Sequence, residues 1–322
     1  MRARTSRFAL FFISLGIAAP ASAQDVPARE STDPLNVVAR VGNEAIDAAA
    51  PQKIVDEVFR GKKKPAGDLL PLVQAQALEE VVKQRLVLAY ARRAGEFPNS
   101  EQIAKAAKQW QIRLAAKGRK ADSMTPADLE RQVIWQLVWD RYLAKYCTAQ
   151  RRQTWFNNHH ADVDGTEMVV SHILLPVAGA GPQKFEDLEK QAEAIRAEIA
   201  SGKLDFAAAA EKYSGGPSAR QGGRLGKIGR HGPMDESFSR AAFQLQAGQI
   251  STPVRSPFGV HLIRCDEVIP GKKTVADLAG SIDDALAKEL LEKLSRLERE
   301  KTPVEYTTAW PHFKPGTMEL AK

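Results

Sequence analysis

One segment, 171–265, constrains the fold of this 322-residue chain more than any other. It begins and ends in apolar runs, and each run carries a histidine, His172 in the first and His261 in the second. Runs of this composition are typical of buried strands. A glycine-rich stretch at 221–226 and segments with helical spacing lie between them. This order predicts a mixed α/β domain over 167–270, with both histidines on strands.

The elements of that domain follow from apolar spacing and from end signals. Strands are expected at Glu167–Pro176 and, in two parts, within 250–268. Helices are expected at 185–201, ended by Gly202, and at Phe206–Tyr213.

The chain before this domain is expected to be mainly helical over 37–150, after a short strand at Val37–Val41. Apolar residues recur there at spacings of three and four, which is the period of one helix face. The stripes comprise Ala75, Leu78, Val82, Leu86 and Ala89; Ile103, Ala107, Trp110 and Leu114; and Ile134, Val138, Tyr142 and Tyr146. Thr125 followed by Pro126 is typical of a capped helix start. The polar stretch 151–166 is interpreted as a linker or a helix end.

The last part of the chain, 271–322, is expected to form a long helix and a tail, with Thr274 and Asp277 at the helix cap. The apolar stripe of this helix comprises Leu278, Ile282, Leu286, Leu290, Leu294 and Leu297. Such a stripe requires an apolar partner, which the N-terminal helices would supply. The predicted fold class is therefore α+β and multidomain, with a mainly helical N-terminal domain completed by a C-terminal helix, plus the mixed α/β domain.

Residues 1–23 have the pattern of a secretory signal peptide. Three arginines, at positions 2, 4 and 7, precede an apolar run at 8–19, and a small-x-small pattern precedes Gln24. A flexible polar leader is expected at 24–36. The apolar run is shorter than the roughly 20 residues that span a bilayer, and no later segment is long and apolar enough. We therefore expect an exported chain without a transmembrane segment after cleavage, which suits a periplasm.

Net charge and cysteine usage exclude little. The formal charge of +7 falls to +4 without the three N-terminal arginines and is spread over the chain, so a nucleic-acid partner is not expected. Cys147 and Cys265 fall in different predicted domains, and two free thiols are favoured over one bridging pair. His159 and His160, with Asp162 nearby, point apart on a strand or a helix, so they are interpreted as solvated rather than as a metal site.

The ordered motifs of 171–265 resemble the parvulin-type peptidyl-prolyl cis/trans isomerases. The resemblance rests on the two strand histidines, the glycine-rich turn at 221–226 and the apolar run from Met234 to Phe243. A helical domain closed by a C-terminal helix is similar to the exported parvulin-containing chaperones of the SurA and PrsA kind. The resemblance implies an isomerase and folding chaperone that acts on unfolded or proline-containing exported polypeptides.

The resemblance also implies site residues. His172 and His261 match the hydrogen-bonded histidine pair of the family, and Ser256 occupies the place of a small hydroxyl residue in the same network. The implied proline pocket comprises Leu225, Met234 and Phe238, with Phe243 beneath it. Rotation about an X-Pro bond has a barrier of about 20 kcal/mol that comes mostly from amide resonance. Because no covalent bond is broken, no metal or cofactor is expected.

Some positions depart from the family pattern. Gly216 stands where a cysteine or an acidic residue is usual near the substrate carbonyl, and Arg224 replaces a common acid in the glycine turn. A glycine cannot polarise or hydrogen-bond a carbonyl through a side chain. Two interpretations therefore stay open: an isomerase of weak activity that is also a chaperone, and a non-catalytic chaperone or peptide-binding protein with a degenerate parvulin domain.

Overall fold

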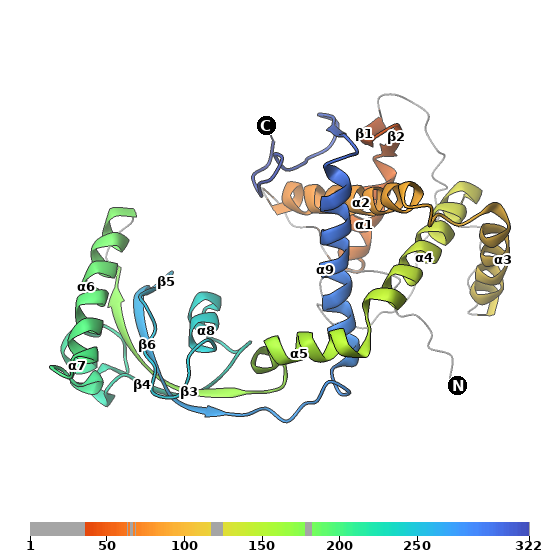
Figure 1. Cartoon of the computed structure of the whole chain (residues 1–322). Helices are drawn as coiled ribbons and strands as arrows, with labels where there is room; N and C mark the ends of the chain where they lie inside the picture. The colour runs from red at the N-terminus through yellow and green to blue at the C-terminus, as the bar shows by residue number, and fades with distance from the viewer. Residues whose placement is uncertain are drawn as a thin grey trace. The chain divides into compact units, whose positions relative to one another are not determined.

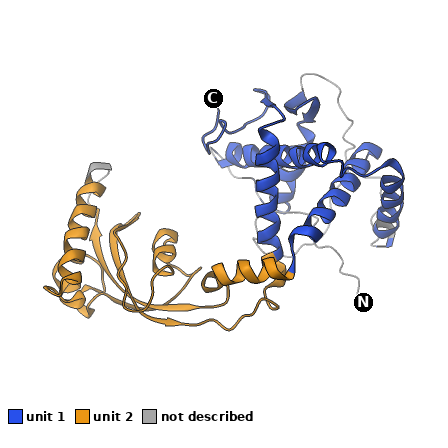
Figure 2. Cartoon of the chain, in the orientation of Figure 1, with its two compact units in different colours: residues 1–148, 283–322 blue, residues 149–282 orange. Residues whose placement is uncertain are grey.

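The computed structural model describes residues 36–62, 64, 67, 69–116, 125–177 and 182–321. The predicted signal peptide and all but the last residue of the predicted leader lie outside the described residues. Figure 2 shows two compact units, one formed by 1–148 together with 283–322 and the other by 149–282. We call the first the helical unit and the second the sheet unit.

The helical unit contains a small antiparallel sheet in the order β2-β1-β7. β1 spans Val37–Val41, β2 spans Glu44–Asp47 and β7 spans Val304–Tyr306. β7 pairs with β1 although the two strands lie far apart in the sequence. The sheet packs on α2, Leu69–Arg93. The buried core between them comprises Val38, Ala39, Val41, Ile46, Leu78, Val81, Val82 and Leu86.

The helical unit contains further helices. They are α1 at Ala49–Val58, α3 at Ser100–Ala116, α4 at Pro126–Tyr146 and most of α9 at Ala279–Arg299 (Figure 1). Thr125 caps α4 as predicted, because its Oγ1 accepts a hydrogen bond from the Asp128 N–H at 3.1 Å. The cap satisfies one of the free donors at the helix start.

α9 completes the core of the helical unit. Its buried side chains form one cluster with those of α2 and α4. The cluster comprises Val87, Leu88, Ala91, Val138, Trp139, Tyr142, Leu143, Ala287, Leu290, Leu291 and Leu294. The predicted fold class is therefore confirmed: a mainly helical N-terminal domain is completed by a C-terminal helix and accompanied by a mixed α/β domain.

Two details of the last helix differ from the prediction. α9 begins only at Ala279, because the predicted cap forms within the preceding turn. There the Thr274 N–H and hydroxyl donate to Asp277 Oδ2 at 2.8 and 2.7 Å. Leu297 is 38% exposed, so the buried stripe ends at Leu294.

α3 is the helix whose predicted stripe is least buried. Its stripe residues Ile103, Ala107 and Trp110 are only half-buried, and Ile112 is 61% exposed. Helical spacing thus predicted the element correctly but not the extent of its burial, because spacing does not report how much apolar surface the neighbouring helix covers.

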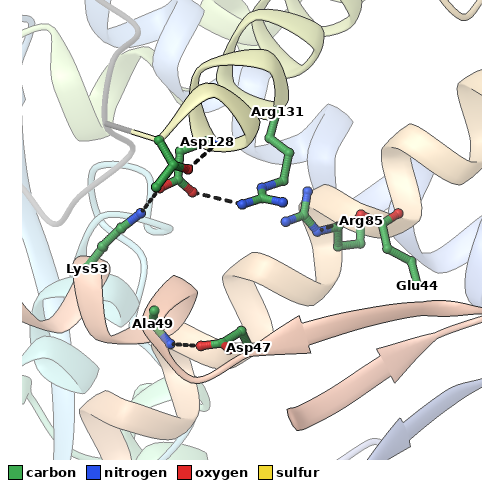
Figure 3. A network of polar contacts seen from close by, with 8 residues as sticks. Glu44, Asp47, Ala49, Lys53, Arg85, Asp128 and Arg131 are labelled. Atoms are coloured by element: carbon green, nitrogen blue, oxygen red, sulfur yellow. Dashed lines mark hydrogen bonds and ion pairs between the residues drawn. The ribbon is translucent and has the colours of Figure 1, made fainter. Parts of the chain in front are cut away.

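Charged side chains connect β2, α1, α2 and α4 (Figure 3). Arg85 of α2 pairs with Glu44 of β2 at 3.2 Å. Asp128, in the first turn of α4, accepts from Lys53 Nζ and Arg131 Nη2, each at 2.9 Å. Burial lowers the pKa of the Arg85 guanidinium, and Glu44 opposes that shift. The Arg85–Glu44 and Lys53–Asp128 pairs join elements that are distant in sequence, whereas the Arg131–Asp128 pair lies within α4.

The sheet unit contains a four-stranded antiparallel sheet in the order β4-β3-β6-β5. The strands are β3 at Glu167–Pro176, β4 at Arg224–Gly229, β5 at Val254–Ser256 and β6 at Gly259–Ile269. The helices are α5 at Ala149–Val163, α6 at Pro182–Ala200, α7 at Phe206–Tyr213 and α8 at Glu236–Ala242, with a 3-10 turn, η3, at Ala219–Gln221.

Helices cover both faces of this sheet. α6 and α7 lie on one face and α8 lies on the other (Figure 1). β3 and α7 have the predicted bounds, and most of the polar stretch 151–166 is helix, as α5. Both cysteines are free thiols, Cys147 half-buried and Cys265 buried.

Candidate active site

Two histidines lie side by side on the face of the sheet that α8 covers. β3 and β6 pair so that His172 is opposite Ile263 and His261 is opposite Leu174. Residues two apart on a strand share a face, so the two histidines are diagonal neighbours. Their Nδ1 atoms are 3.2 Å apart, and their rings are inclined by 21°. Both residues are buried, with 6% and 5% of their surface exposed.

Ser256, at the end of β5, extends this chain of polar groups. Its Oγ lies 2.7 Å from His261 Nε2 and accepts a hydrogen bond from the Phe258 N–H at 3.1 Å. The turn into β6 depends on Gly259, whose φ is +141° and whose Cβ, if present, would lie 2.1 Å from Leu175 O. Since no side chain fits there, the turn requires glycine and places Ser256 beside His261.

Burial keeps both imidazoles neutral. It lowers the pKa of His172. Burial, reinforced by the neighbouring His172, lowers the pKa of His261 to about 4, against the opposing effect of Asp235. At neutral pH each ring therefore has one N–H donor and one acceptor nitrogen. The pair offers oriented hydrogen bonds rather than a cation.

The residues of the predicted pocket adjoin the histidine pair. Phe238 of α8 meets both rings edge-on, with centroid distances of 5.8 Å to His172 and 5.2 Å to His261. Leu225, Met234 and Phe243 are half-buried against the same core cluster as Phe238. The structure thus brings all seven predicted site residues to one face of the sheet. A partly exposed apolar wall beside neutral polar groups suits an apolar ring attached to an amide.

Comparison with known proteins agrees with this geometry. Residues 172–267 match the rotamase family, described as a PPIC-type PPIASE domain. These residues form a parvulin-type domain.

The parvulin domain lies within a longer likeness. The chain is 28% identical over 295 residues to chaperone SurA of Thiobacillus denitrificans, which covers 85% of this chain and 65% of that protein. It is 25% identical over 326 residues to foldase protein PrsA of Caldanaerobacter subterraneus, covering 94% and 93%. The chain therefore spans less than two thirds of the SurA proteins that it matches.

Solved structures give a weaker likeness. A crystal structure of peptidylprolyl isomerase PrsA from Bacillus anthracis matches 70% of this chain and 96% of that chain at 23% identity, with a TM-score of 0.30. The family assignment rests on the sequence match to the family and not on this superposition.

Gly216 lies directly against the histidine pair of the parvulin domain. It is buried, and a Cβ at this position would lie 3.3 Å from His172 Nε2 and 3.4 Å from Ser214 Oγ. Its φ is outside the left-handed region, so the backbone itself does not require glycine here. With glycine at this position, residue 216 has no side chain beside His172 Nε2.

Two positioning residues escaped the sequence analysis. The carbonyl of Gly223 accepts from the His172 N–H at 2.8 Å, and a Cβ on Gly223 would lie 2.2 Å from His172 O. Ser214 Oγ accepts from the Leu174 N–H at 3.0 Å and from the Gly216 N–H at 3.3 Å. The glycine-rich turn was the only signal of the first, and the serine after α7 gave no signal that distinguishes it from an ordinary helix end.

The described part of the chain has no group of three His, Cys, Asp or Glu residues arranged to hold a metal ion. His159 Nδ1 lies 2.7 Å from Trp155 O, and His160 Nδ1 lies 3.1 Å from Asp164 Oδ2, so the adjacent histidines have separate partners. Among the described residues, no helix is both long and apolar enough to cross a bilayer.

Proposed function

We propose that this chain is an exported peptidyl-prolyl cis/trans isomerase and folding chaperone that acts on unfolded, proline-containing polypeptides. The observation that carries the proposal is the neutral pair of His172 and His261, with Phe238 edge-on to both rings. Burial removes both imidazoles from water, and their hydrogen bonds offset that cost only in part, because His172 Nε2 has no hydrogen-bond partner among the described residues. The position of the pair beside a half-exposed apolar wall supports a role in binding.

The proposed mechanism is rotation about the X-Pro bond without covalent chemistry. Met234, Leu225 and Phe238 would receive the pyrrolidine ring, which restricts the proline side of the amide. The barrier of about 20 kcal/mol comes from amide resonance, so the site accelerates rotation if it binds the twisted amide more tightly than the planar one. An apolar setting favours the twisted form, because a less conjugated amide carries less charge separation and loses less on desolvation.

The histidine pair would shape this setting rather than exchange protons with the substrate. With a lowered pKa, His261 stays neutral at working pH, and His172, whose pKa is also lowered, does the same. Protonation would introduce a charge beneath the pocket and favour the planar, more polar amide. We propose that the histidine pair and Ser256 orient one another beside the apolar wall and keep that side of the pocket uncharged.

The alternative is a non-catalytic chaperone with a degenerate parvulin domain, and Gly216 favours it. No side chain at this position is available to interact with the substrate carbonyl. In that case the apolar wall would bind proline-containing segments without accelerating their rotation.

The clients and the compartment follow from weaker observations. The names of the matched relatives, chaperone SurA and foldase protein PrsA, support a role in protein folding. The pattern of residues 1–23 supports export to a periplasm. We propose no nucleic-acid partner and no cofactor.

One paired experiment separates the two functions. Isomerisation of a short proline peptide and suppression of aggregation of an unfolded client are measured on the same preparation. Acceleration that Phe238→Ala abolishes supports the isomerase. No acceleration together with intact suppression of aggregation leaves only the chaperone.

A further inference from the structure

An acidic residue, Asp235, lies at the rim of the candidate site. It directly follows Met234 and precedes Phe238 by three positions, so it lies between two residues of the pocket wall. Its Oδ1 accepts a hydrogen bond from the Ser237 N–H at 2.9 Å and caps α8. Ser237 Oγ is within hydrogen-bond distance of Asp235 Oδ1 and lies 2.6 Å from the carbonyl oxygen of Arg255. The carboxylate is therefore fixed where α8 meets the end of β5.

Asp235 is charged at neutral pH, and its charge acts on the site. Hydrogen bonds from Ser237 hold the pKa of the Asp235 carboxyl below its usual range, although burial opposes that shift. Asp235 raises the pKa of His261 against the larger effect of burial, and His261 lowers the pKa of Asp235. Interactions of this kind weaken with distance and are screened by water. The negative charge of Asp235 therefore reaches the side of the pocket that the histidine pair forms.

The charged groups around Asp235 already have partners. Glu236 accepts from Arg230 through both of its carboxylate oxygens, at 2.7 and 2.9 Å. Arg255 Nη2 lies 2.6 Å from Glu189 Oε2. By contrast, no lysine or arginine of the described part of the chain forms an ion pair with Asp235, whose partners are donors of the first turn of α8. Its charge is therefore available to a ligand in the pocket.

We propose that Asp235 is a specificity-determining residue that makes the pocket prefer polypeptides with a lysine or arginine directly before or after the proline. With the pyrrolidine ring against Met234 and Phe238, the neighbouring residues of the polypeptide cross the rim of the pocket. A basic side chain there meets a fixed carboxylate and displaces no existing partner, whereas an acidic side chain is repelled. The inference rests on the proposed function, because it assigns a substrate class to the same pocket.

The test uses full-length protein and short peptides that differ only beside the proline. One set carries lysine, glutamine or glutamate directly before the proline, and another carries them directly after it. In at least one set, kcat/KM for isomerisation is expected to be about 2- to 5-fold higher with lysine than with glutamine, which is the range of an exposed ion pair, and lowest with glutamate. The preference should shrink at about 1 M salt, where charges are screened within about 3 Å.

Two substitutions of adjacent residues isolate the charge of Asp235. Asp235→Asn removes the charge but keeps a side-chain oxygen that caps α8, and it should bring the ratio of kcat/KM between lysine and glutamate peptides close to one. Glu236→Gln changes the net charge by the same amount, but Arg230 already neutralises Glu236, so this control should keep the preference. The ratio between peptides is compared within each variant, because it does not depend on the overall activity of that variant.

Peptide dissociation constants, measured by NMR titration of the same proteins, separate this inference from the proposed function. Isomerisation without a charge preference overturns the inference alone, as does a preference that survives Asp235→Asn or is lost equally in Glu236→Gln. Binding that prefers lysine through Asp235, without any isomerisation, supports the inference and overturns the isomerase. Peptides that are neither bound nor isomerised would overturn both.

Discussion

The two units bury polar groups in different ways. In the sheet unit, His172, His261 and Ser256 are buried as neutral groups joined by hydrogen bonds across adjacent strands. In the helical unit, Glu298 is 2% exposed and ionised, with Arg93 Nη2 at 2.7 Å from its Oε2. Arg93 holds the pKa of that carboxyl below its usual range, together with Thr302, against the opposing effect of burial.

The comparison distinguishes buried polar groups that belong to the candidate site from buried polar groups that join two helices of the fold. The Arg93–Glu298 pair joins α2 to α9 across 205 residues of sequence, where an ion pair contributes little net stability but is costly to break on one side. The histidine pair joins β3 and β6, which backbone pairing already holds together from Glu167 to Pro176 with one irregularity at Val169 and Val170. The burial of the histidine pair is therefore better explained by a role in the site than by a contribution to the folding stability of the sheet unit.

The largest expected effect follows from removing α9. A chain ending at Gly271 loses the buried leucines that complete the core of α2 and α4, so the helical unit should lose its cooperative thermal transition. The sheet unit keeps all four strands. Hydrogen exchange should show β3 and β6 still protected and α2 and α4 exposed.

The opposite pattern, with α2 protected and β3 exposed, would mean that α9 belongs to the core of the sheet unit. A fragment of 149–282 provides the complementary measurement. It should unfold cooperatively, because both of its core clusters lie within it.

Substitutions of Phe238 and Met234 should show which pocket residues of the sheet unit also contribute to its hydrophobic core. Phe238 is 2% exposed, so Phe238→Ala should destabilise the unit by about 3–5 kcal/mol and abolish isomerisation. Met234 is only half-buried. Met234→Ala should therefore lower kcat/KM for a proline peptide with a smaller loss of stability.

Thermal unfolding and peptide isomerisation of both variants make the check. A Met234→Ala protein with wild-type kcat/KM would remove this residue from the pocket. A Phe238→Ala protein that unfolds like the wild type would remove Phe238 from the core.

In the helical unit, a matched pair of leucines tests the burial of α9. Leu290 is 5% exposed and Leu297 is 38% exposed on the same helix. Leu290→Ala should cost about 2–5 kcal/mol of unfolding free energy, since it leaves a cavity in the core. Leu297→Ala should cost much less. Equal losses in urea unfolding would contradict the assigned face of α9.

Sequence patterns predicted the sheet unit in more detail than the helical unit. β3 and α7 have the predicted bounds, and the seven predicted site residues lie together, because strand alternation and the family motif each fix side-chain direction. In the helical unit α2, α3, α4 and α9 were predicted and α1 was not, and Leu297 and α3 were assigned too much burial. A repeat of apolar residues every 3.6 positions shows which face of a helix is apolar. It does not show how much of that face another element covers, because that depends on the tertiary structure.

Within the site, sequence did not predict what Gly216 changes. The backbone does not require glycine at this position, because its φ lies outside the left-handed region. The physical consequence, an unsatisfied His172 Nε2, depends on a tertiary contact between the α7 end and β3. Such a contact has no signature in local spacing.

The smallest expected effect is the pH dependence that His261 gives to the sheet unit. The pKa of His261 is lowered from 6.5 to about 4 on folding, so between these values the unfolded chain binds a proton that the folded protein does not. The contribution of neutral His261 to the free energy of unfolding is therefore fully present above about pH 6.5. It falls as the pH drops toward 4, by up to about 3 kcal/mol. His172, whose pKa is also lowered by burial, shifts in the same direction.

His261→Gln isolates this contribution, because the variant cannot titrate at that position. Hydrogen exchange of β3 and β6 should show the wild type losing protection between pH 6.5 and 4.5, and the variant losing less over the same interval. Protection of α2 in the helical unit should respond equally in both proteins, since its buried groups are ion pairs rather than neutral histidines. If the protection of β3 changed with pH in the same way in the wild type and in His261→Gln, His261 would not be buried as a neutral group. The two units would then not differ in how they bury these polar groups.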